Sequence, residues 1–345
     1  MKLKQFQSFL QKEGINLAFL IHPDPNITYF TQMKPSFALL LITPTTASLS
    51  LSELDKPPSI KGLSVLPLQK DWDKKKADPK IKKIGIHKSS ISLSYVEKLQ
   101  KLYPRAKLVD ISPILNELRS QKTPEEIAKI TRACAITTQA FNALIREFSL
   151  NKFKTEQDVA FFLEKFIRER GAELAFPTIV ASVKNSATPH HITSSTKLTK
   201  GFIQLDLGAC YKNYCSDMSR SLYIGKPSSA EKAHYRILHQ VQTKIIEEVA
   251  INKSFVELEK ISRKNLGKYS SYFIHSLGHG VGVEIHEAPA FSKEAKQTIK
   301  PNHIFTIEPG IYFPQKYGIR IEDTLLFNGK AKILTTAPKE LISLK

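Results

Sequence analysis

The stretch FIQLDLGACYKNYCSDMSRSLYI, residues 202–224, combines two apolar strand-like segments with a polar turn between them. Tyr211, Lys212 and Asn213 form the predicted turn, because Asn tolerates the left-handed backbone that a tight hairpin requires. Asp206 and Asp217 flank this turn, so antiparallel pairing can bring both carboxylates to one face of a sheet. Taken alone, each aspartate fits a capped turn residue better than a ligand, and other segments must decide between the two interpretations.

The segment HSLGHGVGVEIHE, residues 275–287, holds three histidines within twelve residues, namely His275, His279 and His286. A single histidine here would be interpreted as a satisfied core residue, whereas three imidazoles in one neighbourhood indicate a site. The interleaved glycines at 278, 280 and 282 are expected to let the backbone approach a ligand closely.

Two glutamates, Glu308 in FTIEPG and Glu322 in IRIEDT, lie in the middle of apolar strand-like stretches. For either glutamate alone a solvated strand face is the simpler interpretation. Together with the two aspartates and one imidazole, however, they offer four negative charges that would offset two divalent cations. A pair of such cations can hold a bridging hydroxide and polarise a carbonyl group.

The first part of the chain, residues 1–118, is predicted to be a small α/β domain. Helices are expected near Leu3–Glu13 and Ser92–Leu102, where apolar side chains recur at helical spacing. Strand-like stretches bounded by Pro, Asp or Ser lie at residues 17–21, 27–31, 37–42, 47–52, 83–87 and 107–110.

The second part, residues 119–345, opens on a strong helix start, with Thr123 as N-cap, Pro124 at the first helical position and Glu126 completing a capping box. Thr155 with Asp158 and Ser228 with Glu231 repeat this signature before two more helices. Strands are expected at residues 175–183, 202–209, 214–224, 303–313 and 318–327. Helices that cluster apart from largely antiparallel strands predict an α+β domain.

Composition and charge exclude several classes of protein. No apolar run approaches the roughly 20 residues of a membrane helix, and the N-terminus MKLKQFQSFLQKEG has no signal-peptide pattern. A soluble, cytoplasmic protein without a membrane partner is therefore expected. Cys134, Cys210 and Cys215 are too few for a disulfide scaffold, and the last two are interpreted as small strand residues rather than half a zinc site.

The net charge of +19 suggests an anionic partner only if the charge is concentrated. The densest basic run, residues 70–83, is interrupted by Asp and Pro and lacks aromatic residues other than Trp72. It is interpreted as a solvated loop, and no nucleic-acid partner is expected.

Four motifs in a fixed order resemble the pita-bread metallopeptidases, the family of methionine aminopeptidases, aminopeptidase P and prolidases. The motifs are DLGACYKNYCSDMSR, HSLGHGVGVEIHE, FTIEPGIYF and GIRIED. In addition, DPNITYFT (24–31) and LVDISPILNELRSQKTPEEI (108–127) resemble the accessory domain of the creatinase, aminopeptidase P and prolidase branch. The resemblance implies a creatinase-like α/β N-terminal domain, a pita-bread catalytic domain, and hydrolysis of the Xaa-Pro bond at the N-terminus of peptides.

The same resemblance implies a role for each site residue. Asp206 would bind one metal ion, Asp217 and Glu322 would bridge both ions, and His279 and Glu308 would complete the second. His190, from ATPHHIT, and His286 would flank the substrate and stabilise the tetrahedral intermediate. His275 and Arg320 would lie near the substrate, and Glu308 would accept the proton of the attacking hydroxide. His191 receives no role from the match and is interpreted as structural, while Asn213 stands where the family commonly has Gly.

The implied cofactors are two divalent ions, with Mn or Co favoured and Zn or Fe also compatible. Proline-containing peptides are the expected substrates, and the resemblance implies a homodimer. Some microbial prolidases have an arginine where this chain has Ala290, so longer peptides are expected to be cleaved at least as well as dipeptides. The alternative interpretations are a non-catalytic protein of the same fold and a basic nucleic-acid-binding protein.

Overall fold

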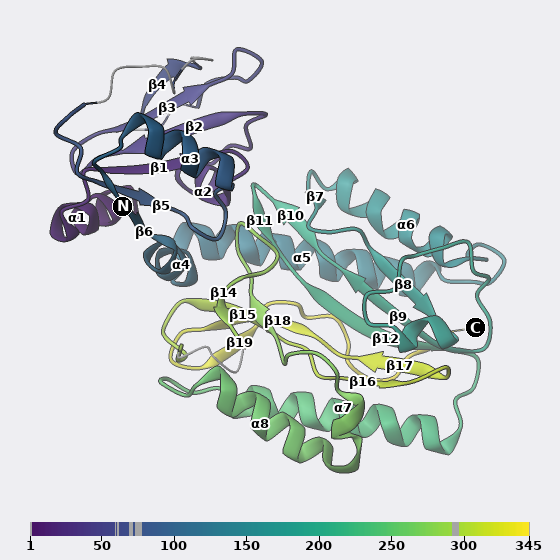
Figure 1. Ribbon diagram of the computed structural model, residues 1–345. Helices are drawn as coiled ribbons and strands as arrows, with labels where there is room; N and C mark the ends of the chain where they lie inside the picture. Colours follow the sequence, from purple (N-terminus) through teal and green to yellow (C-terminus); the bar gives the residue numbers. More distant parts are fainter. Residues whose placement is uncertain are drawn as a thin grey trace. The chain divides into compact units, whose positions relative to one another are not determined.

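The computed structural model describes residues 2–58, 60, 62–68, 72, 78–291 and 297–344. The chain divides into two compact units, Met1–Arg119 and Ser120–Lys345, and Figure 1 traces the chain through both. Of the basic run at 70–83, residues 70, 71 and 73–77 lie outside the described residues. None of the helices in the described ranges is long and apolar enough to cross a membrane.

The first unit is built on a six-stranded mixed sheet in the order β4-β3-β2-β1-β5-β6. Its strands are β1 (Leu17–Ile21), β2 (Ala38–Ile42), β3 (Ala47–Leu51), β4 (Ser64–Pro67), β5 (Lys83–Ile86) and β6 (Lys107–Asp110). Its helices are α1 (Lys2–Glu13), α2 (Pro25–Thr31), α3 (Leu93–Leu102) and α4 (Ser112–Ser120). The predicted small α/β domain is confirmed.

One predicted strand of this unit is wrong, because residues 27–31 belong to helix α2. Asp24 caps this helix by accepting a hydrogen bond from the backbone N–H of Asn26, and Pro25 occupies its first turn. These are helix-start signals, and they outweigh the strand-like apolar composition of the short run that follows.

The second unit contains four longer helices, α5 (Pro124–Glu147), α6 (Glu156–Glu169), α7 (Ser229–Glu247) and α8 (Phe255–Leu266), and the short 3₁₀ helices η2 (Val183–Ala187) and η3 (Gly267–Tyr272). The three predicted capping boxes are present at Thr123, Thr155 and Ser228, each with the reciprocal side-chain bonds. A fourth box, at Ser254 and Glu257, starts α8.

The strands of this unit form a four-stranded sheet (β20-β12-β9-β8), a five-stranded sheet (β14-β13-β15-β18-β19), a three-stranded sheet (β11-β10-β7) and the pair β16-β17. Their bounds are β7 (Glu173–Leu174), β8 (Ile179–Ser182), β9 (Gly201–Leu207), β10 (Ala209–Tyr211), β11 (Tyr214–Cys215), β12 (Met218–Ile224), β13 (His279–Gly280), β14 (Glu287–Ala290), β15 (His303–Ile307), β16 (Gly310–Phe313), β17 (Tyr317–Arg320), β18 (Asp323–Phe327), β19 (Ala331–Ile333) and β20 (Ser343–Leu344). All pairings in this unit are antiparallel except β12 with β20.

Two apolar cores lie on opposite sides of these strands. Helices α5 and α6 pack on β8, β9 and β12 through residues such as Phe141, Leu163 and Leu205. Helices α7 and α8 pack on β15 to β18 through residues such as Leu238, Phe255 and Phe305. Figure 1 shows the strands of this unit between the two helix pairs, which is the layered α+β arrangement that the sequence predicts.

The hairpin predicted around residues 211–213 forms, but Tyr211 belongs to strand β10 and not to the turn. Tyr211 pairs with Tyr214, so Lys212 and Asn213 are the two turn residues, and their φ angles of 48° and 68° are left-handed. Two positive φ values in succession are typical of the type I′ turn that suits twisted hairpins. Cys210 and Cys215 lie opposite each other in this hairpin as buried free thiols, in agreement with their interpretation as small strand residues.

Candidate metal centre

The acidic residues cluster where paired strands end. Asp206 lies within β9, but Asp217 immediately precedes β12, and Glu308 immediately follows β15. The β15–β18 ladder ends at the pair Ile307 and Asp323, so Glu308 and Glu322 are the next residues beyond it. The prediction that both glutamates lie in mid-strand is therefore wrong, and the ends of the ladders free these side chains to converge.

The solvated-face interpretation of the two glutamates is also wrong, and both aspartates are likewise largely buried. Glu322 is 1% exposed and Asp217 is 4% exposed. The side chains of Asp206 and Glu308 are only 13% and 14% exposed. Asp206 pairs with Ser219, two residues beyond Asp217, which places the two aspartates diagonally on one face of the β9–β12 pair.

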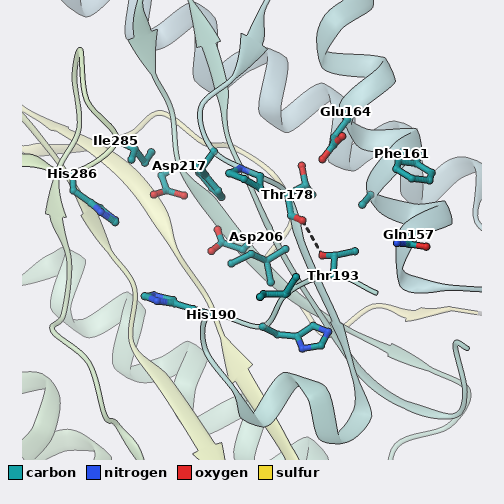
Figure 2. A pocket seen from close by; sticks show the side chains of 16 residues that line it. Gln157, Phe161, Glu164, Thr178, His190, Thr193, Asp206, Asp217, Ile285 and His286 are labelled. Atoms are coloured by element: carbon teal, nitrogen blue, oxygen red, sulfur yellow. Dashed lines mark hydrogen bonds between the residues drawn. The ribbon is translucent and has the colours of Figure 1, made fainter. Parts of the chain in front are cut away.

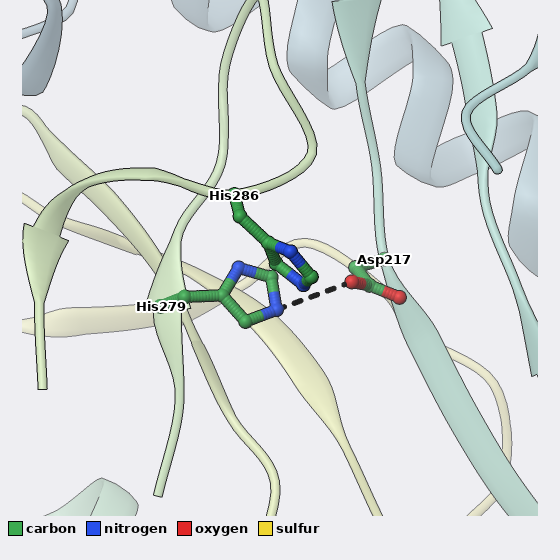
Figure 3. Close-up of side chains that lie close together, drawn as sticks. All are labelled: Asp217, His279 and His286. Atoms are coloured by element: carbon green, nitrogen blue, oxygen red, sulfur yellow. Dashed lines mark ion pairs between the residues drawn. The ribbon is translucent and has the colours of Figure 1, made fainter. Parts of the chain in front are cut away.

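The acids and histidines form three overlapping groups whose potential ligand atoms lie within 4.8 Å of one another. The groups are Asp206, Asp217 and Glu322; His279, Glu308 and Glu322; and Asp217, His279 and His286. The structure thus brings together all five side chains predicted as metal ligands. Figure 3 shows the third group, in which the imidazoles of His279 and His286 lie next to each other, with ring centroids 4.2 Å apart, and Nε2 of His279 lies 3.4 Å from the carboxylate of Asp217.

Several carboxylate oxygens in this cluster are buried without a hydrogen-bond partner among the described residues. They are Oδ1 of Asp206, Oδ1 of Asp217 and Oε1 of Glu322. A buried charged oxygen without a partner is costly, and all three belong to one group of converging carboxylates. This donor set fits a divalent cation, which would satisfy the unpaired oxygens and offset their charge.

Without a bound cation, the surroundings of the clustered carboxylates favour their protonated forms. Burial, followed by repulsion from the neighbouring carboxylates, raises the pKa of Asp217 and that of Glu322 well above their usual values. Burial also raises the pKa of Glu308, although His279 and Arg320 oppose the shift. A bound cation would act in the opposite direction, because positive charge stabilises the ionised form.

The imidazole of His279 is held by a backbone contact. Its Nδ1 lies 3.1 Å from the carbonyl oxygen of Gly280, so Nδ1 carries the proton and donates to that oxygen. The other ring nitrogen, Nε2, therefore presents its lone pair 3.4 Å from Asp217 and 3.5 Å from Glu308. A backbone acceptor that fixes the tautomer in this way is a common support for ligating histidines.

The glycines of residues 275–287 lie where neighbouring protein segments approach the backbone closely. A Cβ atom at Gly278 would lie 2.1 Å from the carbonyl oxygen of Thr306, and one at Gly280 would lie 2.3 Å from that of Ala288. At Gly282 it would lie 2.1 Å from Oε1 of Glu287. These glycines allow neighbouring protein segments to pack against the strand that carries His279, and close approach of a ligand at them stays a prediction.

Arg320 is buried, and all three nitrogens of its guanidinium donate hydrogen bonds. Its Nη2 donates to Oδ2 of Asp206 at 2.6 Å, its Nε donates to Ser219 at 2.8 Å, and its Nη1 donates to the Tyr312 hydroxyl at 3.0 Å. Ser219 in turn donates to Oε2 of Glu322 at 2.8 Å. One guanidinium thus orients two of the clustered carboxylates, directly at Asp206 and through Ser219 at Glu322.

His275 continues this network. Its Nδ1 donates to the carbonyl oxygen of Ser276, so Nε2 accepts from the Tyr312 hydroxyl at 2.9 Å. Burial and the nearby Arg320 lower the pKa of His275 to about 3, so the ring is neutral at physiological pH. Neither Tyr312 nor Ser219 was identified from the sequence. Ser219 follows Asp217 by two residues and therefore shares its strand face, so the sequence could have indicated that Ser219 lies at the site. For Tyr312 the sequence gives no such indication.

Two cavities meet at the cluster. The smaller, of about 260 Å³, is lined by the five clustered residues and by His190, His275, Ser276, His286 and Arg320. The larger, of about 570 Å³, shares Asp206, Asp217, His190 and His286 with it. Figure 2 shows these four side chains around the larger cavity. Burial, together with repulsion from His279, lowers the pKa of His286 to about 4.

His191 contacts helix α6. Its Nε2 lies 2.9 Å from Oε2 of Glu156, a carboxylate with 0% exposure at the start of α6. Glu156 also accepts hydrogen bonds from Ser182 and Ser194. This network ties the segment that carries His190 to α6, which supports the structural interpretation of His191.

Comparisons with known proteins agree with this geometry. Residues 128–328 match Metallopeptidase family M24, and residues 2–121 match the Creatinase/Prolidase N-terminal domain. A protein of Pyrococcus horikoshii named Xaa-Pro dipeptidase is 36% identical over 351 aligned residues, which cover 99% of this chain and 98% of that protein.

Solved structures are similar over the same length. The prolidase from Pyrococcus horikoshii has a TM-score of 0.90 at 33% identity, with 99% of each chain covered. An X-Pro aminopeptidase from Thermotoga maritima has a TM-score of 0.91 at 30% identity, again with 99% of each chain covered.

Repulsion and burial of charge among the clustered carboxylates should lower the free energy of unfolding of the metal-free protein, and this effect can be tested. Because the folded-state pKa of Asp217 lies above its unfolded value, ionisation of this group penalises folding. The penalty is absent below the unfolded pKa of about 3.9 and grows as the pH rises through the folded pKa. With chelator present, Asp217→Asn is expected to raise the free energy of unfolding at pH 8, because the amide removes the buried ionisable group whose charge opposes folding.

Denaturant unfolding at pH 4 and pH 8 measures this effect, and little gain is expected at pH 4. Glu169→Gln is the control, because this glutamate lies on the exposed surface of α6 with its side chain 56% exposed. If Asp217→Asn gives no greater stability than wild type at pH 8, the buried carboxylates do not repel one another as described.

Proposed function

The chain belongs to metallopeptidase family M24 and carries a creatinase/prolidase N-terminal domain, and we propose that it hydrolyses the peptide bond preceding proline at the N-terminus of peptides. The observation that carries this proposal is the group of buried carboxylate oxygens without partners at Asp206, Asp217 and Glu322. The relatives named as Xaa-Pro dipeptidase and X-Pro aminopeptidase supply the substrate class.

Family membership implies divalent metal ions. The cluster contains five side chains that we propose as the ligands of two such ions. Asp206 would hold one ion, His279 and Glu308 the other, and Asp217 and Glu322 would bridge them. The three overlapping groups of ligand atoms support this division. When bound, such ions would activate a water molecule as the nucleophile and polarise the scissile carbonyl. We propose Mn or Co as the native metal, because the donor set mixes an imidazole with carboxylates.

The chain's own residues would supply proton transfer and charge stabilisation. Glu308 lines the smaller cavity beside the other clustered carboxylates, where it would accept a proton from the nucleophile and pass it to the proline nitrogen. His190 and His286 line both cavities and would donate hydrogen bonds to the oxygen on which negative charge develops. His275 and Arg320 would hold this pocket in shape from behind, through Tyr312 and Asp206.

We also propose a homodimer, from the resemblance of the N-terminal unit to the accessory domain of this family branch. The non-catalytic alternative is less well supported, because all five proposed ligand side chains are present and converge. The nucleic-acid alternative gains no support from the two family matches, which are a metallopeptidase family and a creatinase/prolidase N-terminal domain.

Metal removal is the first test of the proposed mechanism. Treatment with a chelator is expected to reduce hydrolysis of an Xaa-Pro peptide to background, and Mn²⁺ or Co²⁺ should restore activity better than Mg²⁺. The reason is that Mg²⁺ prefers an all-oxygen ligand set, whereas this cluster contains an imidazole. Asp217→Ala is the matched variant: it should remain folded but bind fewer than two ions and fail to recover. Full activity of metal-free protein would refute the mechanism.

Substrate length is the second test. Arg320 is the candidate cation for a free proline carboxylate, but its guanidinium already donates to Asp206, Ser219 and Tyr312. Ala290 offers no charge at the end of β14. A missing charge-assisted contact is worth about 1.5 to 3 kcal/mol, so preference for dipeptides should fall by about tenfold or more.

The measurement is the ratio of specificity constants for an Xaa-Pro dipeptide and its one-residue extension at matched metal loading. We expect Xaa-Pro-Yaa to be cleaved at least as well as Xaa-Pro. Exclusive hydrolysis of the dipeptide would show that some cation of this chain does receive the free carboxylate.

A further inference from the structure

The larger cavity extends from the metal centre to helix α6 (Figure 2). Asp206 and Asp217 line it beside the metal centre, and Phe161 and Glu164 line it on α6. A peptide whose scissile carbonyl lies at the clustered carboxylates would therefore have a side chain within reach of this space. The volume of about 570 Å³ falls within the usual range for ligand pockets.

Helix α6 presents one stripe of residues to the cavity. Gln157, Phe161 and Glu164 recur at intervals of four and three residues, so they share a helix face. The opposite face, which includes Val159 and Leu163, packs into the apolar core of this unit. The core-facing side of α6 therefore holds the helix in place, and its cavity-facing residues can contact a ligand.

The walls of the cavity are apolar and partly uncovered. Phe161 is 63% exposed and Ile192 is 85% exposed, although large apolar side chains are usually buried. Phe176, Ile179 and Ile285 add further apolar surface. An aliphatic segment of a ligand lying along these side chains would remove this surface from water.

Glu164 gives the cavity a charge that nothing described in the structure offsets. The chain has 51 lysine and arginine residues, yet none of them is among the described residues that line this cavity. Apart from the two aspartates of the metal centre, Glu164 is the one carboxylate in that lining. Within residues 78–291 and the other described ranges, Glu164 forms neither a hydrogen bond nor an ion pair.

We propose that this cavity receives the side chain of the N-terminal residue of the substrate, and that Glu164 selects lysine or arginine there. The inference rests on the proposed function and specifies its substrate class. The aliphatic stem of either residue would lie between Phe161 and Ile192, and its cationic end would pair with the Glu164 carboxylate. A cation beside the ring of Phe161 would gain further attraction from its π face.

The alternatives are less favourable in this environment. A purely aliphatic side chain would cover the same apolar walls but would leave the carboxylate of Glu164 without a partner and partly desolvated. An acidic side chain would be repelled by Glu164 and by the nearby aspartates. The order of preference should therefore be cationic first, neutral aliphatic second and acidic last.

The test compares peptides Xaa-Pro-Ala in which Xaa is lysine, arginine, norleucine or glutamate, with the Mn²⁺-loaded full-length protein. Norleucine retains the straight aliphatic stem but lacks the terminal ammonium, so the lysine-to-norleucine ratio isolates the charge. A partly exposed ion pair of this kind predicts a ratio of kcat/KM of about five. The ratio should fall as salt concentration rises, because the pair is partly screened.

Glu164→Gln should bring the lysine-to-norleucine ratio to about one, and Glu164→Lys should favour glutamate over lysine. Glu169→Gln is the matched control, because Glu169 lies on the same helix but does not line the cavity, and it should keep the wild-type ratio. A wild-type ratio near one, or an unchanged ratio in Glu164→Gln, would overturn the proposal.

The two proposals fail in different ways. If none of the four peptides is hydrolysed, the proposed Xaa-Pro activity is wrong. If the norleucine peptide is cleaved but lysine gains no advantage, the activity stands and the assignment of Glu164 is overturned.

Discussion

The constraint on which the catalytic unit depends is the burial of four carboxylates in one place. Asp206, Asp217, Glu308 and Glu322 converge from strand β9 and from residues next to the ends of β12, β15 and β18, which belong to two different sheets. Like charges at such distances in a desolvated site cannot all be ionised unless positive charge is supplied. The fold supplies one guanidinium from Arg320, and three carboxylate oxygens still have no partner among the described residues. Divalent cations complete the balance.

The surrounding structure holds these acids in place through the backbone. Arg220 is 1% exposed and donates to the carbonyl oxygens of Ser219 and Glu322. It also pairs with Asp323 at 2.7 Å, directly beside Glu322. A buried ion pair is weak support for stability by itself, but Arg220 fixes the chain at Glu322, a proposed bridging ligand, and at the next residue, Asp323. Side chains that must meet within a few ångströms need such support.

Sequence reasoning succeeded where local chemistry decides the structure. The capping boxes and the turn at Lys212 and Asn213 follow from short-range hydrogen bonds and φ preferences, which a few neighbouring residues specify. It failed at Glu308 and at residues 27–31, because apolar composition alone does not show where a strand ladder ends or that a cap starts a helix. The contacts of Tyr312 with Arg320 and His275 depend on long-range packing, so the sequence contains no local signal for them.

The central claim is that the clustered side chains bind two divalent ions. A crystal structure of the Mn²⁺-loaded protein, with anomalous difference maps recorded on both sides of the manganese absorption edge, tests it directly. The account predicts two manganese peaks in this cavity, both within bonding distance of Asp217 and Glu322, with His279 bound to only one of them. Absence of manganese from the cavity at saturating Mn²⁺, or manganese bound only through other residues, would contradict it.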